Sequence, residues 1–182
     1  MRLEREKDPE FWVEIVDLIC RATSDVMFML VGDGRLRTAV ERQLDIRGLS
    51  RRAILTGTVS DELASHYALF DLFLLTSRFE GLPNVLLEAQ FCGVPVVAPD
   101  VGGVREAMDP GHTGIAVGQR EPAAFAEAIL RLLGDRDQLA RMSNAARALS
   151  AQFHPDRVLA RLDEIYGTQT GKADHDRILL HS

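Results

Sequence analysis

The chain has 182 residues and a formal net charge of −6, and it is 46% hydrophobic and 26% charged. This length suits one domain with a sizeable core. The acidic balance and the scattered arginines argue against a nucleic-acid-binding protein, which usually carries a clustered basic face. No apolar run approaches the length of a membrane span, and the first ten residues do not resemble a signal peptide. We therefore expect a cytoplasmic protein.

The first two thirds of the sequence alternate between helical and strand patterns. Asp8 and Pro9 predict the start of a helix, as its cap and first helical residue. Apolar runs then predict strands separated by helices, with the strands near residues 26–31, 53–57, 71–76, 94–99 and 113–117 and the helices near 36–47, from Ser60-Asp61 to 70, 83–92 and 102–108. Nearly continuous apolar strands between helices predict an α/β fold, Rossmann-like, with a mainly parallel sheet and helices on both faces.

The pattern changes from residue 121 onward. Residues 121–166 contain three helical stretches with no strand between them, which predicts a C-terminal helical cap on the sheet. Residues 167–182 are mostly polar, and we expect a flexible tail there. The sequence thus predicts one domain over residues 1–166.

The stretch SRFEGLPNVLLEA, residues 77–89, follows the strand predicted at 71–76. Ligands of open α/β sheets bind beyond the carboxyl ends of the strands, so this loop is expected at the binding rim. Gly81 lets the backbone approach a ligand, and Pro83 suits the first turn of a helix. The first amides of that helix predict an anion site suited to phosphate, to which Asn84 can add a donor.

Two carboxylates flank this turn. Helical side chains lean toward the N-terminus, so Glu88 should reach back to the rim and accept hydrogen bonds from a vicinal diol such as a ribose. Glu80 precedes the helix and should face a second polyol, a sugar. Alone, Glu80 could be a helix cap and Glu88 a solvated acid. Together, around a Gly-Leu-Pro turn, they favour a ligand with phosphate between two polyols, which is the shape of a nucleotide sugar.

The run from Ser77 to Met108 resembles the nucleotide-sugar signature of retaining glycosyltransferases of the GT-B fold, the family 4 type (glycosyl transferases group 1). The matching elements are Glu80 and Glu88 with seven residues between them, Gly93-Val94-Pro95-Val96-Val97, Gly102-Gly103 and Glu106. The resemblance extends from about Arg2 to Tyr166. It implies that the chain is the C-terminal, donor-binding half of such an enzyme.

The resemblance also implies roles for individual residues. Glu80 would hold hydroxyls of the donor sugar, Glu88 would hold the ribose, and the cations Arg2 and Lys7 would neutralise the diphosphate. Sugar and phosphate would meet the backbone at Gly81, Leu82, Asn84 and Val85, and the base would lie near Gly32, Gly57 and Val59. The donor would be a UDP- or GDP-sugar carrying a hexose, and no metal or other cofactor is expected. The five histidines show no spacing typical of metal ligands.

The resemblance leaves part of the enzyme unaccounted for. Its acceptor-binding N-terminal domain and the first strand of the donor domain find no match here. We therefore expect unpaired strand edges, possible self-association through them, and no transferase activity of the chain alone. The complete enzyme would serve cell-surface polysaccharide or glycolipid synthesis, with peripheral attachment at the inner membrane face. The alternatives are a non-catalytic nucleotide-binding or assembly module and, ranked lower, a nucleotide-sugar epimerase.

Overall fold

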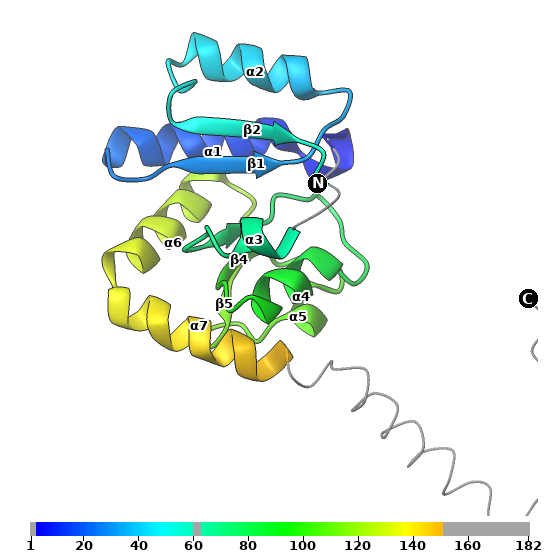
Figure 1. Cartoon of the computed structure of the whole chain (residues 1–182), viewed down its shortest axis with the longest axis vertical. Helices are drawn as coiled ribbons and strands as arrows, with labels where there is room; N and C mark the ends of the chain where they lie inside the picture. Colours follow the sequence, from blue (N-terminus) through cyan, green and yellow to red (C-terminus); the bar gives the residue numbers. More distant parts are fainter. Residues whose placement is uncertain (1–2, 60–62, 151–182) are drawn as a thin grey trace, which may run out of the picture.

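A computed structural model describes residues 3–59 and 63–150 of the chain (Figure 1). Four sequence-based predictions lie outside these residues. They are Arg2 as a diphosphate ligand, the helix start at Ser60-Asp61, the last helical stretch of the cap and the tail over residues 167–182.

Helices and strands alternate along the described residues, as the sequence predicts. In chain order they are η1 (Arg5–Lys7, a short 3-10 helix), α1 (Pro9–Ala22), β1 (Phe28–Val31), α2 (Arg37–Ile46), β2 (Ala53–Gly57), α3 (Leu63–Tyr67), β3 (Phe73–Leu74), α4 (Asn84–Phe91), β4 (Val96–Pro99), α5 (Val104–Ala107), β5 (Gly114–Val117), α6 (Pro122–Gly134) and α7 (Arg136–Ser150). Asp8 is the N-cap of α1 and Pro9 its first residue, which confirms that prediction.

Every strand pair is parallel, which confirms the predicted α/β class. The strands nevertheless form two sheets rather than one. β1 pairs with β2, and β3, β4 and β5 form a three-stranded sheet in that order. No ladder within the described residues joins β1 to β3.

The strand β4 shows how helices cover both faces of the larger sheet. Val96 and Ala98 point into a cluster built with α3, α4 and α5. Val97 lies between them and points to the opposite face, into a cluster built with α1, α6 and α7. Alternate residues of a strand face opposite sides of a sheet, so both faces are buried and all four residues of β4 are covered.

The smaller sheet has a core of its own. Trp12, Val13 and Val16 of α1, Leu30 of β1, and Val40 and Leu44 of α2 are its central members. Figure 1 shows α2 beside β2 and α1 overlapping β1, and the two helices also contact each other. Helix α1 therefore contributes to two cores, because its residues Phe11, Ile15 and Ile19 belong to the cluster beneath β4.

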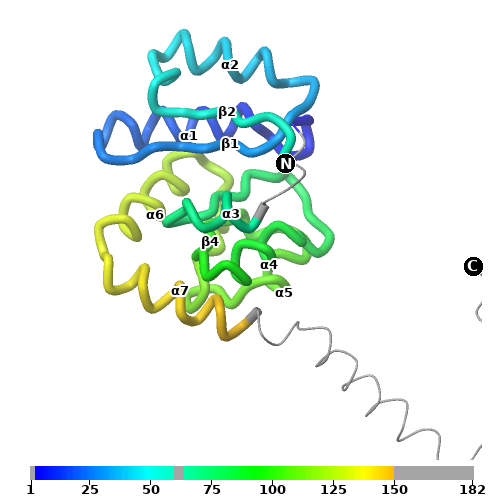
Figure 2. Tube along the Cα trace, viewed as in Figure 1, coloured from blue at the N-terminus to red at the C-terminus, as the bar shows by residue number. Residues whose placement is uncertain are grey.

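The C-terminal helices of the described part confirm the first two stretches of the predicted cap. Helix α7 follows α6 directly and packs against both α6 and α4 (Figure 2). None of the described helices is long and apolar enough to cross a membrane.

Candidate donor site

The segment before α1 connects the two sheets at the carboxyl ends of their strands. The amide of Leu3 donates to the carbonyl of Asp33, after β1, at 2.8 Å. At the other end of the segment, the amide of Arg78 donates to the carbonyl of Glu6 at 2.9 Å. Residues 3–8 thus lie between the loop after β1 and the loop after β3, where the sequence predicts the diphosphate.

Lys7 and Glu80 meet at this junction. The Lys7 ammonium donates to Oε1 of Glu80 at 2.6 Å, although 73 residues separate the two in the sequence. The side chains are 23% and 11% exposed, so the pair is largely shielded from water. An ion pair of this burial requires both charges to be well placed, because each loses much of its hydration. The residue expected to hold the sugar hydroxyls and one of the two cations expected at the diphosphate are therefore adjacent.

The backbone of Glu80 rests on the loop that precedes α5. The amide of Gly103 donates to the carbonyl of Glu80 at 3.1 Å. A Cβ atom at Gly102 would lie 1.9 Å from the Glu80 carbonyl oxygen, and one at Gly103 would lie 2.0 Å from that of Gly81. Only residues without a side chain allow this approach. The sequence identifies the Gly-Gly pair. In the structure the backbone of these two glycines packs directly against the backbone of Glu80 and Gly81.

The helix after the turn begins one residue later than expected. Pro83 has extended backbone (φ −78, ψ 95) and occupies the N-cap position, so Asn84, not Pro83, is the first helical residue of α4. Gly81, Leu82 and Asn84 are exposed and Val85 is partly exposed. No side chain caps this helix end. The predicted anion site at the first amides of α4 therefore stays a prediction.

Glu88 is oriented by a residue that the sequence analysis does not single out. The buried hydroxyl of Tyr67 on α3 donates to Oε2 of Glu88 at 3.0 Å, and it also reaches the carbonyl of Val85 at 3.3 Å. Burial, together with the charge and hydrogen bond of Glu88, raises the pKa of Tyr67 far above its usual value. Tyr67 therefore stays protonated and holds the Glu88 carboxylate. A tyrosine on a helical apolar face gives no signal of this contact in the sequence.

Two of the three residues predicted near the base also lie together. Gly32, at the end of β1, forms an isolated bridge with Gly57, at the end of β2. Both glycines have positive φ (146° and 78°), a conformation that larger residues rarely adopt. Val59 follows two residues beyond Gly57 and is partly exposed.

The predicted residues thus form three local groups: Lys7 with Glu80, Glu88 with Tyr67, and Gly32 with Gly57. Glu80 and Glu88 have different partners, and no hydrogen bond of the described residues joins the two carboxylates. They are connected through the first turns of α4, which begins four residues after Glu80 and carries Glu88.

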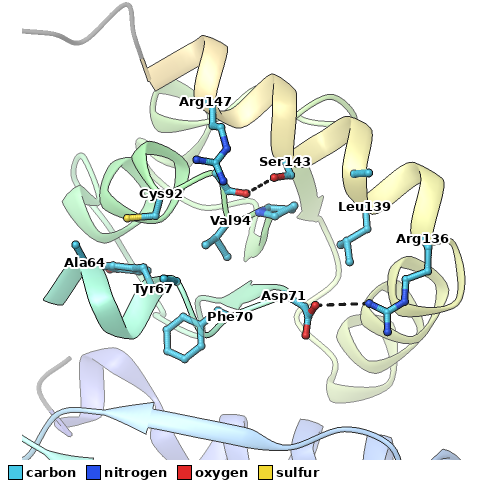
Figure 3. A pocket seen from close by; sticks show the side chains of 14 residues that line it. Ala64, Tyr67, Phe70, Asp71, Cys92, Val94, Arg136, Leu139, Ser143 and Arg147 are labelled. Carbon is cyan, nitrogen blue, oxygen red and sulfur yellow. Dashed lines mark hydrogen bonds and ion pairs between the residues drawn. The ribbon is translucent and has the colours of Figure 1, made fainter. Parts of the chain in front are cut away.

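Two surface hollows lie elsewhere. A cavity of about 560 Å³ is bordered by α3, the end of α4 and α7 (Figure 3). Ser143 donates to the carbonyl of Gly93 at 2.6 Å along its wall, and Arg136 pairs with Asp71 at 3.6 Å. A smaller hollow of about 330 Å³ lies beside Asp17 and Arg47. None of the predicted site residues within the described part of the chain lines either hollow.

The thiols and possible metal ligands lie apart from these groups. Cys20 and Cys92 are partly buried and not disulfide-bonded, and burial raises the pKa of each thiol. Within residues 3–59 and 63–150 there is no group of three or more His, Cys, Asp or Glu side chains that could hold a metal ion.

Comparison with known proteins places this arrangement in a family. The chain is 36% identical over 151 residues to alpha-D-kanosaminyltransferase of Streptomyces kanamyceticus, covering 82% of this chain and 39% of that protein. It is 33% identical over 170 residues to a GDP-mannose-dependent phosphatidylinositol monomannoside mannosyltransferase of Mycobacterium tuberculosis, covering 88% of this chain and 44% of that protein. The chain therefore spans about two fifths of the length of these relatives.

Solved structures show the same fold. The Anabaena protein HepE, crystallised with UDP, superposes with a TM-score of 0.80 at 25% identity over 94% of this chain and 47% of HepE. TarM of S. aureus superposes with a TM-score of 0.81 at 21% identity, over 91% of this chain and 34% of TarM. The fold is that of one half of a GT-B glycosyltransferase, as the sequence predicts. The model of the family described as "Glycosyl transferases group 1" matches residues 1–135, and the chain belongs to this family.

Proposed function

We propose that the chain is the donor-binding domain of a retaining glycosyltransferase that uses a UDP- or GDP-sugar. The observation that carries the proposal is the Lys7–Glu80 pair, which lies at the carboxyl ends of the strands. It brings a cation into contact with a carboxylate that lies four residues before the first residue of α4. The relative that uses GDP-mannose and the neighbour crystallised with UDP support a nucleotide sugar as the ligand.

The proposed reaction moves a hexose-type sugar to an acceptor hydroxyl. The bond between the anomeric carbon and the diphosphate oxygen breaks, and its electron pair leaves with the diphosphate. A new bond would form between the anomeric carbon and the acceptor oxygen, and the acceptor proton would pass to the departing diphosphate. Lys7 and the α4 amides would offset the charge that grows on the diphosphate, which stabilises the transition state more than the ground state. Glu80 would hold the sugar hydroxyls, and Glu88 would hold the ribose.

The rest of the enzyme would provide the acceptor. The chain spans less than half of its relatives' length, so we propose that a further domain binds the acceptor in the complete protein. The relatives include a protein named for an inositol lipid and one named for the Vi polysaccharide of Salmonella typhi. These names support a function in cell-surface polysaccharide or glycolipid synthesis, with the complete enzyme near a membrane surface.

Isothermal titration of the chain with UDP, GDP and their hexose derivatives tests the proposal. We expect binding of one nucleotide series at micromolar to millimolar concentration, and a loss of roughly tenfold in affinity for Glu88→Ala, which removes the ribose acceptor. Glu127→Ala, an exposed acid within α6, is the matched control and should bind as the unchanged chain does. No binding at millimolar nucleotide, or full affinity of Glu88→Ala, would refute the site. Nucleotide affinity without turnover in the complete protein would favour a non-catalytic binding module.

A further inference from the structure

Arg120 joins three loops at the carboxyl ends of the strands. It lies between β5 and α6, and its guanidinium donates to Oδ2 of Asp8 at 2.7 Å. It also donates to the carbonyls of Thr76 and Ser77 at 2.8 and 3.0 Å. The guanidinium carbon lies 4.5 Å from the ring centroid of Phe11, which fixes its plane. Five potential donors in a rigid fork make arginine suited to such a junction.

Asp8 is the acidic partner, and its backbone is unusual. It has φ 48 and ψ 60, and it is the one non-glycine residue with positive φ in the described part of the chain. Its side chain is buried, and its carboxylate also pairs with Arg78 at 3.0 Å. The left-handed conformation costs energy at a residue with a Cβ atom, so these contacts must hold it in place.

These contacts act directly on Lys7, the residue before Asp8. The hydroxyl of Thr76 donates to the Lys7 carbonyl at 2.8 Å, and Arg120 holds the carbonyl of the same threonine. The left-handed turn at Asp8 sets the direction in which the chain leaves Lys7. The backbone of Lys7 is therefore held by the hydrogen bond to its carbonyl and by the left-handed turn at Asp8. From this held backbone the Lys7 ammonium reaches Glu80.

We propose that Arg120 and Asp8 form a positioning unit that places the Lys7 ammonium against Glu80 and the donor diphosphate. The diphosphate part of this statement rests on the proposed function, whereas the Lys7–Glu80 part does not. Arg120 itself does not touch Glu80 in the structure. It acts through Asp8 and Thr76, and its removal would let Lys7 turn away while the fold persists.

The first test uses the stability of the full chain and needs no nucleotide. A double-mutant cycle of Lys7→Met and Glu80→Gln, followed by urea unfolding, measures the coupling of the ion pair. We expect a coupling of about fivefold in the unfolding constant, which corresponds to a shielded pair. When the same cycle is measured in a chain that also carries Arg120→Gln, the coupling factor between Lys7 and Glu80 should fall to near one. An unchanged coupling would overturn the proposal. Arg120→Lys, which keeps the charge, provides a second variant if Arg120→Gln does not fold.

The second test measures affinity for UDP and GDP. We expect Arg120→Gln to weaken binding about tenfold when Lys7 is present and to have no effect in Lys7→Met. A merely structural role would weaken both backgrounds equally and would overturn the proposal. If Lys7→Met binds normally while Arg120→Gln still abolishes the ion-pair coupling, the diphosphate function of Lys7 fails and the positioning unit stands.

Arg52→Gln is the matched control for both tests. Arg52 also donates to three backbone carbonyls, those of Cys20, Thr23 and Val26. These carbonyls lie in the last turn of α1 and in the loop between α1 and β1, at the opposite end of the strands from Lys7. Arg52→Gln should lower stability without changing the Lys7–Glu80 coupling. A loss of coupling in this variant as well would show that general destabilisation causes it, and would overturn the proposal.

Discussion

Asp8 combines an ordinary function with an unusual backbone. Its carboxylate accepts the amide of Phe11 at 3.4 Å, the cap contact that an aspartate before a proline predicts. The left-handed conformation at this position is typical of glycine, so the side chain and the backbone favour different residues there. The chain retains the carboxylate, and Arg78 and Arg120 surround it with positive charge.

Two substitutions separate these contributions. Asp8→Ala loses the cap and the ion pairs but keeps the strained backbone, and we expect a loss of about 2–4 kcal/mol in the free energy of unfolding. Asp8→Gly loses the same contacts but relieves the strain, so it should be about 1 kcal/mol less destabilising. Urea unfolding of both variants measures the difference. Equal stability of the two would show that the left-handed turn imposes no cost.

At this scale the sequence predicts contacts between near neighbours and misses distant ones. The cap of α1 lies within three residues of its partner, and it was correctly predicted. Arg120 contacts Asp8 across 112 residues, and Tyr67 contacts Glu88 across 21. Nothing in the residues around Arg120 or Tyr67 indicates these partners, because their chemistry would suit many surface or core positions. Resemblance to a family identified Lys7, and the structure supplied the residues that hold it.

Helices α1 and α2 are joined by an ionic contact. Asp17 of α1 accepts hydrogen bonds from Arg21 at 2.8 Å and from Arg47, just after α2, at 2.9 Å. Burial raises the pKa of Asp17, but the hydrogen bonds and charges of the two arginines outweigh it, so the pKa lies below its usual value. The ionised carboxylate is thus favoured more in the folded chain than in the unfolded one.

This contact predicts a stability that depends on pH. A depressed folded-state pKa contributes stability above the unfolded pKa of about 3.9, and the contribution is lost as the pH falls through the lower folded pKa. Asp17→Asn should therefore cost about 1.5–3 kcal/mol at pH 7 and progressively less below about pH 4. Urea unfolding between pH 7 and pH 3 measures this. The exposed Asp25→Asn is the control, and a difference between Asp17→Asn and the unchanged chain that does not vary with pH would contradict the assignment.

The sequence predicts helices well where a proline marks the first residue or a glycine follows the last one. The helices α1 and α6 begin at prolines, and α2 is followed by Gly48, which has φ 68. Helix α4 begins one residue later than the sequence predicts, because Pro83 suits both the N-cap and the first helical position. The strand near residues 71–76 is reduced to Phe73–Leu74 in the structure. A strand assignment requires a partner, and β3 pairs on one side only, which an apolar run does not reveal.

The described part of the chain contains two sheets, and they differ in how completely their strands are buried. β4 is central in its sheet and fully buried, whereas β2 is an edge strand whose Ile54 is 48% exposed. A two-stranded sheet is marginal by itself and depends on the helices packed against it. Here α1 is shared between both cores, so it links the stability of the smaller sheet to the larger one.

We therefore expect the β1–β2 region to open more readily than the β4–β5 region. Native-state hydrogen exchange should show amides of β1 and β2 exchanging by partial opening, at a free energy below that of global unfolding. Amides of β4 should exchange only with global unfolding, because both of their faces are packed. Val13→Ala removes a buried contact of the smaller core alone. It should accelerate hydrogen exchange at the amides of β1 and β2 but not at those of β4. Equal protection of the two sheets would contradict this division.

The 2.6 Å contact between Lys7 and Glu80 has a consequence for any anion that enters the site. Each of the two side chains is the counter-ion of the other, so their fields largely cancel beyond the contact. An incoming diphosphate gains the full attraction of the ammonium only when its own oxygens, or those of the attached sugar, replace the carboxylate. Binding is then an exchange of ionic partners, and added salt should weaken it less than a count of cations would suggest.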